Sequence, residues 1–141
     1  MAEHCTYCVA VAEHEPADGW VYRDEHWAVV HGPAETTLAG GLLLRSVRHF
    51  VNFADMTDAE AASFGRLLGR LDEAIHHAVE AERVHLVSTR DRVPHFHAWL
   101  YPRAASSPLR GTDFLAAAQT GTANEARRAT AILQDHLAVT A

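Results

Sequence analysis

The sequence contains no lysine, so arginine supplies all 12 of its basic residues. Acidic residues number 18, which leaves a formal net charge of -6, and no dense basic run occurs. Because binding to a nucleic-acid backbone needs clustered basic side chains, we expect no nucleic-acid polymer as a partner. Arginine rather than lysine favours bidentate contacts to phosphate or carboxylate groups wherever such contacts are made.

Long apolar runs are also missing from the sequence. No segment is apolar for long enough to span a bilayer, and the start "MAEHCTYCVAVAEHEP" lacks the basic and apolar regions of a signal peptide. We therefore expect a cytoplasmic protein without a membrane partner. The sequence has neither a glycine-rich phosphate loop nor a G-x-S-x-G elbow, which argues against a P-loop NTPase and an α/β-hydrolase.

Cysteine is scarce, and the two cysteines, Cys5 and Cys8, are spaced C-x-x-C. In a cytosolic chain this spacing indicates metal binding or redox chemistry rather than a structural disulfide. A tetrahedral zinc site needs two further ligands, for which His49 and His95 are candidates because both lie at strand ends. A redox dithiol is disfavoured because no helix is predicted directly after the pair. Two unliganded surface thiols are the third alternative. Other histidines compete as ligands on composition alone: His4, His14, His26, His31 and His85.

The composition is typical of a globular protein, with 48% hydrophobic and 21% charged residues. A length of 141 residues suits one domain with an ordinary core. We therefore predict a single domain over 1–141, with a core at about 5–103 and a C-terminal helical extension over 104–141.

Five segments have the pattern of β-strands. They are rich in valine, leucine and aromatic residues, and the connections between the first three are short. Short connections of this kind favour an antiparallel sheet, so the predicted class is α+β, with a five-stranded antiparallel sheet. The predicted strands are 20–24, 26–31, 42–47, 83–88 and 94–101, and 1–19 are predicted to be an irregular lead-in.

The clearest predicted helix follows the third strand. Thr57 and Glu60 form a T-x-x-E capping box, and apolar residues then recur at helical spacing as far as Val79. Gly65 and Gly69 lie on one face of this helix. Close packing against a sheet or a partner subunit would explain them, and so would neutral sequence drift without a structural role. Two shorter helices are predicted over 113–118 and 124–137, the second with a Thr122–Glu125 capping box.

The last predicted strand carries two histidines that alternate with apolar residues, in "PHFHAWLY". Alternation places His95, His97, Trp99 and Tyr101 on one face and the apolar residues on the face toward the long helix. One imidazole could act as a nucleophile or general base while the other holds a metal. The H-x-H pair alone is explained equally well by two partly exposed histidines on a sheet face that have no catalytic or metal-binding role.

Taken together, these pieces resemble the histidine triad (HIT) family of nucleotide hydrolases and transferases. The resemblance runs from Cys5 to about Arg103 and is carried by the order and spacing of four stretches. "CTYC" is similar to the cysteine pair of the family's zinc-type branch, and "VYRDEHWAVV" to its first hairpin. "AGGLLLRSVRHFVNFADMTDAEAASFGRLL" is similar to the strand and helix start that follow, and "VPHFHAWLYPR" to the H-φ-H-φ-H motif with its trailing proline and arginine.

The resemblance implies a five-stranded HIT-like sheet with a long helix, usually in a homodimer. His97 matches the middle, nucleophilic histidine, which would attack the α-phosphate of a nucleotide and form a nucleotidyl-histidine. His95 matches the first histidine, which in the zinc-type branch joins Cys5, Cys8 and His49 around a structural Zn²⁺.

The sequence departs from the family pattern at several substrate-facing positions. Trp99 replaces the third histidine and has one N–H donor but no proton to transfer. His31 stands where an acidic residue usually meets the ribose, Gly41 replaces the histidine of a G-H pair, and "LVSTRDRV" replaces the phosphate-contacting stretch. Ser88, Thr89 or Arg90 could supply the missing donors. The residues that we expect to contact substrate are His31, Ser88, His95 and Trp99.

Two functional hypotheses follow from this resemblance and its departures. The first is an enzyme that hydrolyses or transfers the nucleotidyl group of dinucleoside polyphosphates or nucleoside phosphoramidates. The second is a catalytically weakened nucleotide-binding protein that keeps the structural zinc. A role in protein–protein contact or a zinc-dependent structural role is a further alternative.

Overall fold

The computed structural model describes residues 4–13 and 15–139 of the chain. Its five strands form one antiparallel sheet in the order β1-β2-β3-β5-β4. The strands are β1 (Tyr22–Arg23), β2 (Trp27–His31), β3 (Leu42–Ser46), β4 (Arg83–Val87) and β5 (His97–Arg103). This confirms the predicted α+β class and the five-stranded antiparallel sheet.

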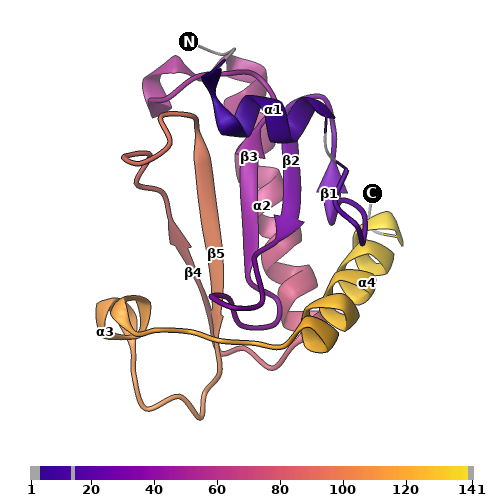
Figure 1. Cartoon of the computed structure of the whole chain (residues 1–141), viewed down its shortest axis with the longest axis vertical. Helices are drawn as coiled ribbons and strands as arrows, with labels where there is room; N and C mark the ends of the chain where they lie inside the picture. Colours follow the sequence, from indigo (N-terminus) through magenta and orange to yellow (C-terminus); the bar gives the residue numbers. More distant parts are fainter. Residues whose placement is uncertain (1–3, 14, 140–141) are drawn as a thin grey trace.

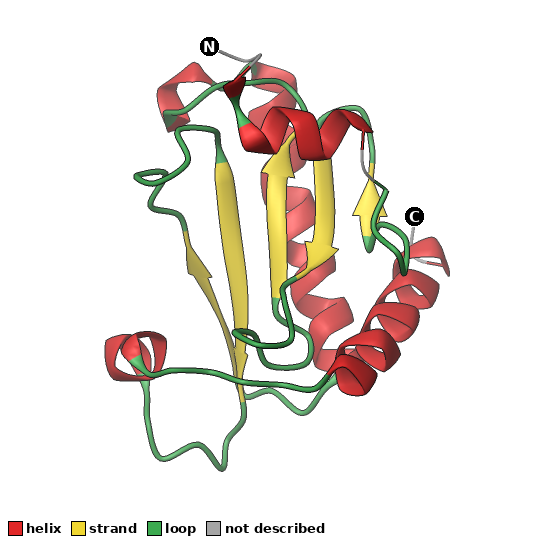
Figure 2. Cartoon of the chain, viewed as in Figure 1, coloured by secondary structure: helices red, strands yellow, loops and turns green. Residues whose placement is uncertain are grey.

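The helices are α1 (Thr6–Glu13), α2 (Asp58–Ala78), α3 (Gly111–Ala116) and α4 (Ala123–Val139), and a 3-10 turn, η2, covers Phe53–Asp55. In Figure 1, α2 lies behind the sheet, and α1 crosses the end of the sheet at the top of the view. Figure 2 shows the same arrangement by element type, with α3 and α4 at the lower end. One sheet face is therefore covered by α2, and α1 reaches the other face at one end only.

The core lies between α2 and the sheet. Leu67, Leu71 and Ile75 of α2 are buried against Leu44 of β3 and Leu100 of β5. The capping box predicted for this helix is present, because Thr57 and Glu60 accept hydrogen bonds from each other's backbone N–H groups. The apolar stripe of α2 thus covers the sheet face that carries Leu44 and Leu100, and His97 lies on the opposite face.

Gly65 and Gly69 do not mark close packing within the chain. A Cβ atom added to either glycine would meet no other atom within 4 Å among the described residues. Neither the sheet nor another helix therefore requires glycine at these positions.

The C-terminal helices differ in what they cover. Leu133 and Leu137 of α4 are buried in the same core cluster as α2. Phe114 of α3 is buried and packs against His85 of β4 at a ring-centroid distance of 5.5 Å. The division into a core over about 5–103 and an extension over 104–141 stays an interpretation, since α4 contributes to the main core.

The last strand begins and ends later than predicted. It starts at His97 because the preceding residue, Phe96, donates its N–H to the Phe50 carbonyl in a loop. It continues through Pro102, where pairing with β3 has already ended at Leu100. A proline is tolerated there because the strand has a paired neighbour on one side only.

The prediction of an irregular segment over 1–19 is wrong at Thr6–Glu13, which form α1. Its sequence, TYCVAVAE, carries β-branched residues and no acidic residue in the first turn, so helix propensity is weak. Packing forms this helix instead: Val11 is buried, and its carbonyl accepts a hydrogen bond from Arg23.

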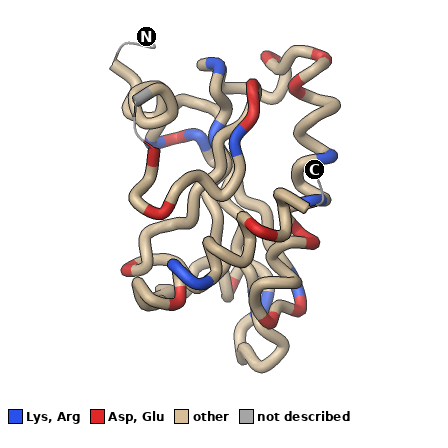
Figure 3. Tube along the Cα trace, turned by 90° about the vertical axis from the view of Figure 1, so that its right-hand side faces the viewer, with Lys and Arg blue, Asp and Glu red and all other residues tan. Residues whose placement is uncertain are grey.

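Acidic and basic residues are interspersed along the described chain, as Figure 3 shows. No helix within the described ranges is both long and apolar enough to cross a bilayer.

Candidate functional site

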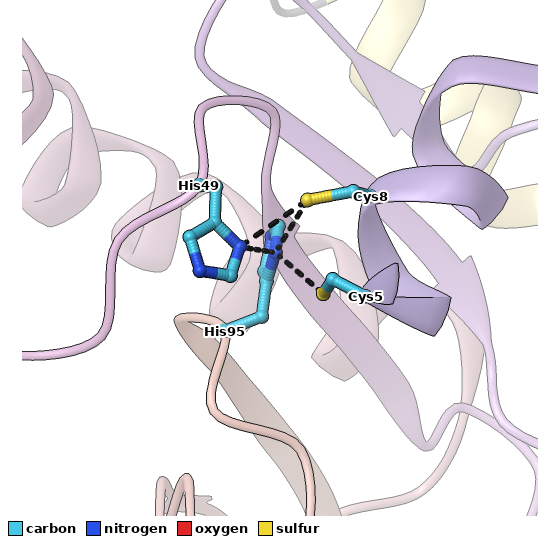
Figure 4. A group of neighbouring side chains, drawn as sticks. All are labelled: Cys5, Cys8, His49 and His95. Carbon is cyan, nitrogen blue, oxygen red and sulfur yellow. Dashed lines mark hydrogen bonds between the residues drawn. The ribbon is translucent and has the colours of Figure 1, made fainter. Parts of the chain in front are cut away.

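Four side chains from three distant segments converge at the end of the sheet where α1 crosses (Figure 4). Cys5 and Cys8 come from the start of α1, His49 from the loop after β3, and His95 from the segment that enters β5. One potential ligand atom from each residue lies within 4.8 Å of all the others. The structure therefore brings together the four residues that the sequence predicted as metal ligands.

The tautomer of His95 shows that its Nδ1 atom is free to bind a metal. Its Nε2 lies 2.7 Å from the Ser46 carbonyl oxygen, which can only accept, so Nε2 carries the proton. The ring is fully buried, and burial lowers its pKa, which favours the neutral form. Nδ1 consequently keeps a lone pair, and a carbonyl held by the other ring nitrogen is the usual support for a metal-binding histidine.

Hydrogen bonding alone does not account for this cluster. Nδ1 of His95 lies 3.4 Å from the Sγ atoms of both Cys5 and Cys8 and 3.2 Å from Nδ1 of His49. Three possible donors would share the one lone pair of a neutral imidazole. In tetrahedral zinc coordination the ligand atoms lie about 3.3–3.8 Å apart, so the observed spacing and the Cys2His2 donor set fit zinc.

The thiols are held inside the protein without a disulfide. Cys5 and Cys8 are both free cysteines, and burial together with the neighbouring Cys5 raises the pKa of Cys8 to about 11. A bound cation would reverse this effect, because metal coordination deprotonates a thiol. The reason that the sequence offered against a redox dithiol is wrong, since α1 begins at Thr6, directly after Cys5. The two nearby histidines favour metal binding instead.

Most of the competing histidines lie elsewhere or outside the described residues. His4 lines the same cavity as Cys5 and His49, but it is not one of the four residues whose ligand atoms converge. His26 is within ion-pair distance of Glu25, and His85 packs against Phe114. His14 lies outside the described residues.

His97 has the opposite tautomer to His95. Its Nδ1 lies 2.7 Å from the carbonyl oxygen of His95, so Nδ1 donates and Nε2 keeps the lone pair. The His97 side chain projects from the sheet face opposite α2, because Ala98 and Leu100 on the alternate face are buried in the core. An unprotonated, fixed imidazole nitrogen is what nucleophilic attack on phosphorus requires.

Two residues that the sequence reading missed surround His97. The Tyr7 ring of α1 lies edge-on to the His97 ring at a centroid distance of 4.9 Å. Arg45 is the cross-strand partner of His97, and its guanidinium carbon lies 5.1 Å from the centre of the Tyr7 ring. The sequence held one signal for Arg45, because a charged residue inside the apolar run LLLRS is unusual for a buried strand.

Trp99 occupies the same face as His97, two residues further along β5. Its ring stacks on Tyr101 with a centroid distance of 5.6 Å and an interplanar angle of 6°. The other edge of the ring packs against the loop after β2, since a Cβ atom on Gly32 would lie 2.9 Å from Trp99. Trp99 is therefore a wall of this face, fixed by Tyr101 and the loop.

Most of the remaining predicted substrate contacts are engaged within the protein. Nδ1 of His31 donates to the Gly32 carbonyl, and its Nε2 accepts from the Gly40 N–H, which fastens the loop between β2 and β3. The Ser88 hydroxyl donates to the His97 carbonyl at 2.6 Å. Both ring nitrogens of His95 face the cluster or Ser46. Substrate contacts by His31, Ser88, His95 and Trp99 stay predictions.

Comparison with known proteins identifies the fold. No protein-family model and no curated protein matches the sequence. Solved structures do match. A zinc-bound histidine triad family protein from Mycobacterium smegmatis has a TM-score of 0.75 and 18% identity, over 99% of this chain and 97% of that one. A hypothetical histidine triad nucleotide-binding protein from Sulfolobus tokodaii has a TM-score of 0.73 and 17% identity, over 96% and 93% of the two chains. A HIT family protein from Bacillus anthracis has a TM-score of 0.66 and 22% identity, over 89% and 87%.

These likenesses show that the chain has the histidine triad fold over nearly its whole length. The Cys2His2 cluster fits the zinc-type branch of that fold, and one similar structure is a zinc-bound protein.

Proposed function

We propose that this protein is a nucleotide hydrolase or nucleotidyl transferase that works through a covalent nucleotidyl-histidine at His97. The observation that carries the proposal is the fixed tautomer of His97, whose Nδ1–H is held by the His95 carbonyl. In the neutral ring the lone pair is therefore on Nε2, on the sheet face opposite α2. The similar structures include a protein described as nucleotide-binding, which supports a nucleotide as the ligand.

In the proposed reaction, Nε2 of His97 bonds to the α-phosphorus of the substrate, and the bond to the leaving group breaks with its electron pair. The leaving group takes a proton from water, because the Trp99 indole has no proton to transfer. Water then attacks the phosphorus, the P–N bond breaks with its electron pair returning to Nε2, and the water proton passes to solvent. The products from adenosine phosphoramidate are AMP and ammonia.

The His95 carbonyl has a second use in this sequence of steps. The imidazole becomes positively charged when Nε2 carries the nucleotidyl group and Nδ1 keeps its proton. A carbonyl oxygen 2.7 Å away stabilises that positive charge as a hydrogen-bond acceptor.

We further propose that Cys5, Cys8, His49 and His95 hold a structural zinc ion. Four protein ligands close the site, so the metal would supply cross-linking rather than a reactive water. The cross-link would fix α1 to β5, which places Tyr7 beside His97.

The second candidate function is nucleotide binding with weakened turnover. Its specific support is the cover over the nucleophile: the His97 side chain is only 6% exposed, and Tyr7 lies against it. Trp99 also supports weakened turnover, because it stands where a side chain that donates a proton to the leaving group would be expected.

We also propose that two copies of the chain pair through β4. This strand is an edge of the sheet, and its Leu86 side chain is 50% exposed. An unpaired edge with an exposed apolar residue is a ready site for strand pairing. A nucleotide and a second copy of the chain are therefore the proposed partners.

The enzymatic proposal is tested by incubating the protein with adenosine phosphoramidate and with diadenosine tetraphosphate and measuring AMP release. We expect wild-type release on at least one substrate and a loss of about 10³-fold or more in His97→Ala. His26→Ala is the matched control, because His26 lies outside the site. AMP binding without AMP release by the wild type would favour the second function.

A further inference from the structure

Arg45 is a buried cation that has no anionic partner among the residues that the structure describes. Arg45 is only 8% exposed, and its Nε atom is buried without a hydrogen-bond partner among the described residues. Within the part of the chain that the structure describes, the contact recorded for the guanidinium is the face of Tyr7. Burial lowers the pKa of Arg45, as expected for a charge removed from water without compensation.

Two other arginines, the exposed Arg48 and the buried Arg103, show what an arginine paired within the protein looks like. Arg48 makes two hydrogen bonds to the Glu60 carboxylate, at 3.0 and 2.7 Å. Arg103, which is 4% exposed, forms an ion pair with Glu82 at 2.7 Å. Among the described residues Arg45 has no such carboxylate, and this separates it from Arg103, whose Nε atom is also buried without a hydrogen-bond partner but whose guanidinium is paired with Glu82.

The position of Arg45 indicates what that missing partner is. Arg45 on β3 lies directly opposite His97 on β5, and residues so paired have Cβ atoms about 4.5–5.5 Å apart on one face of the sheet. Tyr7 contacts both side chains. On the other side of Arg45 the cross-strand neighbour is Ala28, which has no polar side-chain atom. The Arg45 guanidinium and the His97 imidazole therefore share one small and largely buried region of this sheet face.

We propose that Arg45 binds the phosphoryl group that His97 attacks. The inference rests on the proposed function of His97 and names the residue that holds the anion. Guanidinium N–H groups pair with phosphate oxygens in a planar fork, and a positive charge fixed beside the phosphorus stabilises the charge that develops during transfer. Trp99 offers one N–H at most, so Arg45 is the fixed positive charge of this site.

A structural role for Arg45, as a cation held on Tyr7, makes the opposite prediction about stability. If the side chain serves an absent anion, replacing it with methionine removes a buried, uncompensated charge, so the melting temperature stays the same or rises. If it serves the fold, the melting temperature falls. Arg66→Met is the matched control, because Arg66 is exposed on α2.

The test uses the full-length protein as purified, with inorganic phosphate, AMP and adenosine as separate probes. We expect phosphate to shift the ¹H–¹⁵N resonance of the Arg45 Nε–H group in the wild type. In Arg45→Met we expect the Kd for AMP to rise roughly 10- to 150-fold, the Kd for adenosine to stay unchanged and the melting temperature not to fall. Arg66→Met should match the wild type in all of these measurements.

The possible failures of the two proposals are separable. Two results would overturn the assignment of Arg45. One is an Arg45 Nε–H resonance that neither phosphate nor AMP shifts. The other is an Arg45→Met variant that binds AMP as tightly as the wild type. A wild type that shifts with phosphate but neither binds nor cleaves nucleotides overturns the nucleotide function and leaves the anion site standing. A lower melting temperature in Arg45→Met with unchanged phosphate affinity assigns the residue to the fold.

Discussion

His95 and His97 are two residues apart, yet each presents a different ring nitrogen for chemistry. The Ser46 carbonyl holds Nε2–H of His95, and the His95 carbonyl holds Nδ1–H of His97. His95 therefore has its lone pair toward the cysteines, and His97 has its lone pair at Nε2. The sequence identified both histidines, but not their tautomers, because the two carbonyl oxygens reach them only in the folded chain.

Trp99 cannot protonate a leaving group, and replacing it with a residue that can gives a direct prediction. We expect Trp99→His to raise AMP release from adenosine phosphoramidate by about tenfold or more near pH 6.5, because it supplies a general acid for the ammonia leaving group. Loss of the stack on Tyr101 should cost about 1–3 kcal/mol of stability. Steady-state rates and thermal denaturation measure the two effects.

Trp99→Phe is the control for that substitution, since it keeps an aromatic ring without adding a titratable group. A rate increase in both variants would mean that the smaller side chain opens access to His97. No increase in Trp99→His would show that protonation of the leaving group does not limit the rate.

At the scale of elements, the start of α2 is where the sequence was most informative. The capping box at Thr57 and Glu60 was predicted and is present, because both partners lie three residues apart on one segment. The sequence did not predict that Arg48 also binds Glu60, since that contact joins the loop after β3 to the helix. Nor did it predict α1, whose weak local propensity is overcome by packing, with Val11 buried.

The Arg48–Glu60 pair gives a prediction about stability. Glu60 is 2% exposed, and its two hydrogen bonds to Arg48 lower its pKa below the usual value. We expect Glu60→Gln to lower the free energy of unfolding at pH 7 by roughly 1.5–3 kcal/mol, measured by urea denaturation. Glu125→Gln, at the exposed start of α4 where the Glu125 carboxylate accepts from the Thr122 hydroxyl, should change it by less than about 0.5 kcal/mol.

The pH dependence of this effect follows from the direction of the pKa shift. Because the folded-state pKa of Glu60 is depressed, its contribution is full above the unfolded pKa of about 4.3 and is lost as the pH falls through the folded pKa. The difference in stability between the wild type and Glu60→Gln should therefore narrow below about pH 4. A difference that stays constant down to pH 3 would assign the effect to packing rather than charge.

At the scale of the whole molecule, the four-residue cluster ties three parts of the chain together. Cys5 directly precedes α1 and Cys8 lies in it, while His49 belongs to a loop and His95 to the entry of β5. The sequence predicted these four residues because the resemblance to the zinc-type branch gave each one a position. Tyr7 and Arg45 could not be predicted in this way, since the crossing of α1 brings Tyr7 to His97 and the register between β3 and β5 brings Arg45 there.

Removal of the metal tests this cross-link. We expect elemental analysis to find about one zinc per chain, and chelation or Cys5→Ser/Cys8→Ser to remove it and lower the melting temperature. Amide exchange should then accelerate in α1 but change little in α2, because α2 supplies none of the four residues and is held by its own side chains in the core cluster. His26→Ala should retain the metal. Full zinc content in the double cysteine variant would contradict the ligand assignment.

The proposed pairing through β4 is tested by molar mass in solution. Light scattering on a sizing column should give twice the 15.5 kDa chain mass at micromolar concentration. Leu86→Asp should shift the mass to that of one chain, because it places a charge on the exposed edge. Leu109→Asp, at another exposed leucine, is the control and should remain paired. A wild type that runs as one chain would contradict the proposal.

The covalent state of His97 tests the central proposal most directly. Wild-type protein mixed with adenosine phosphoramidate is quenched in alkali, which preserves a phosphorus–nitrogen bond, then digested and analysed by mass spectrometry. We expect one adenylyl group on the peptide that contains His97 and none in His97→Gln. An adenylyl group on another residue, or AMP release by His97→Gln at the wild-type rate, would contradict the assignment of His97 as the nucleophile.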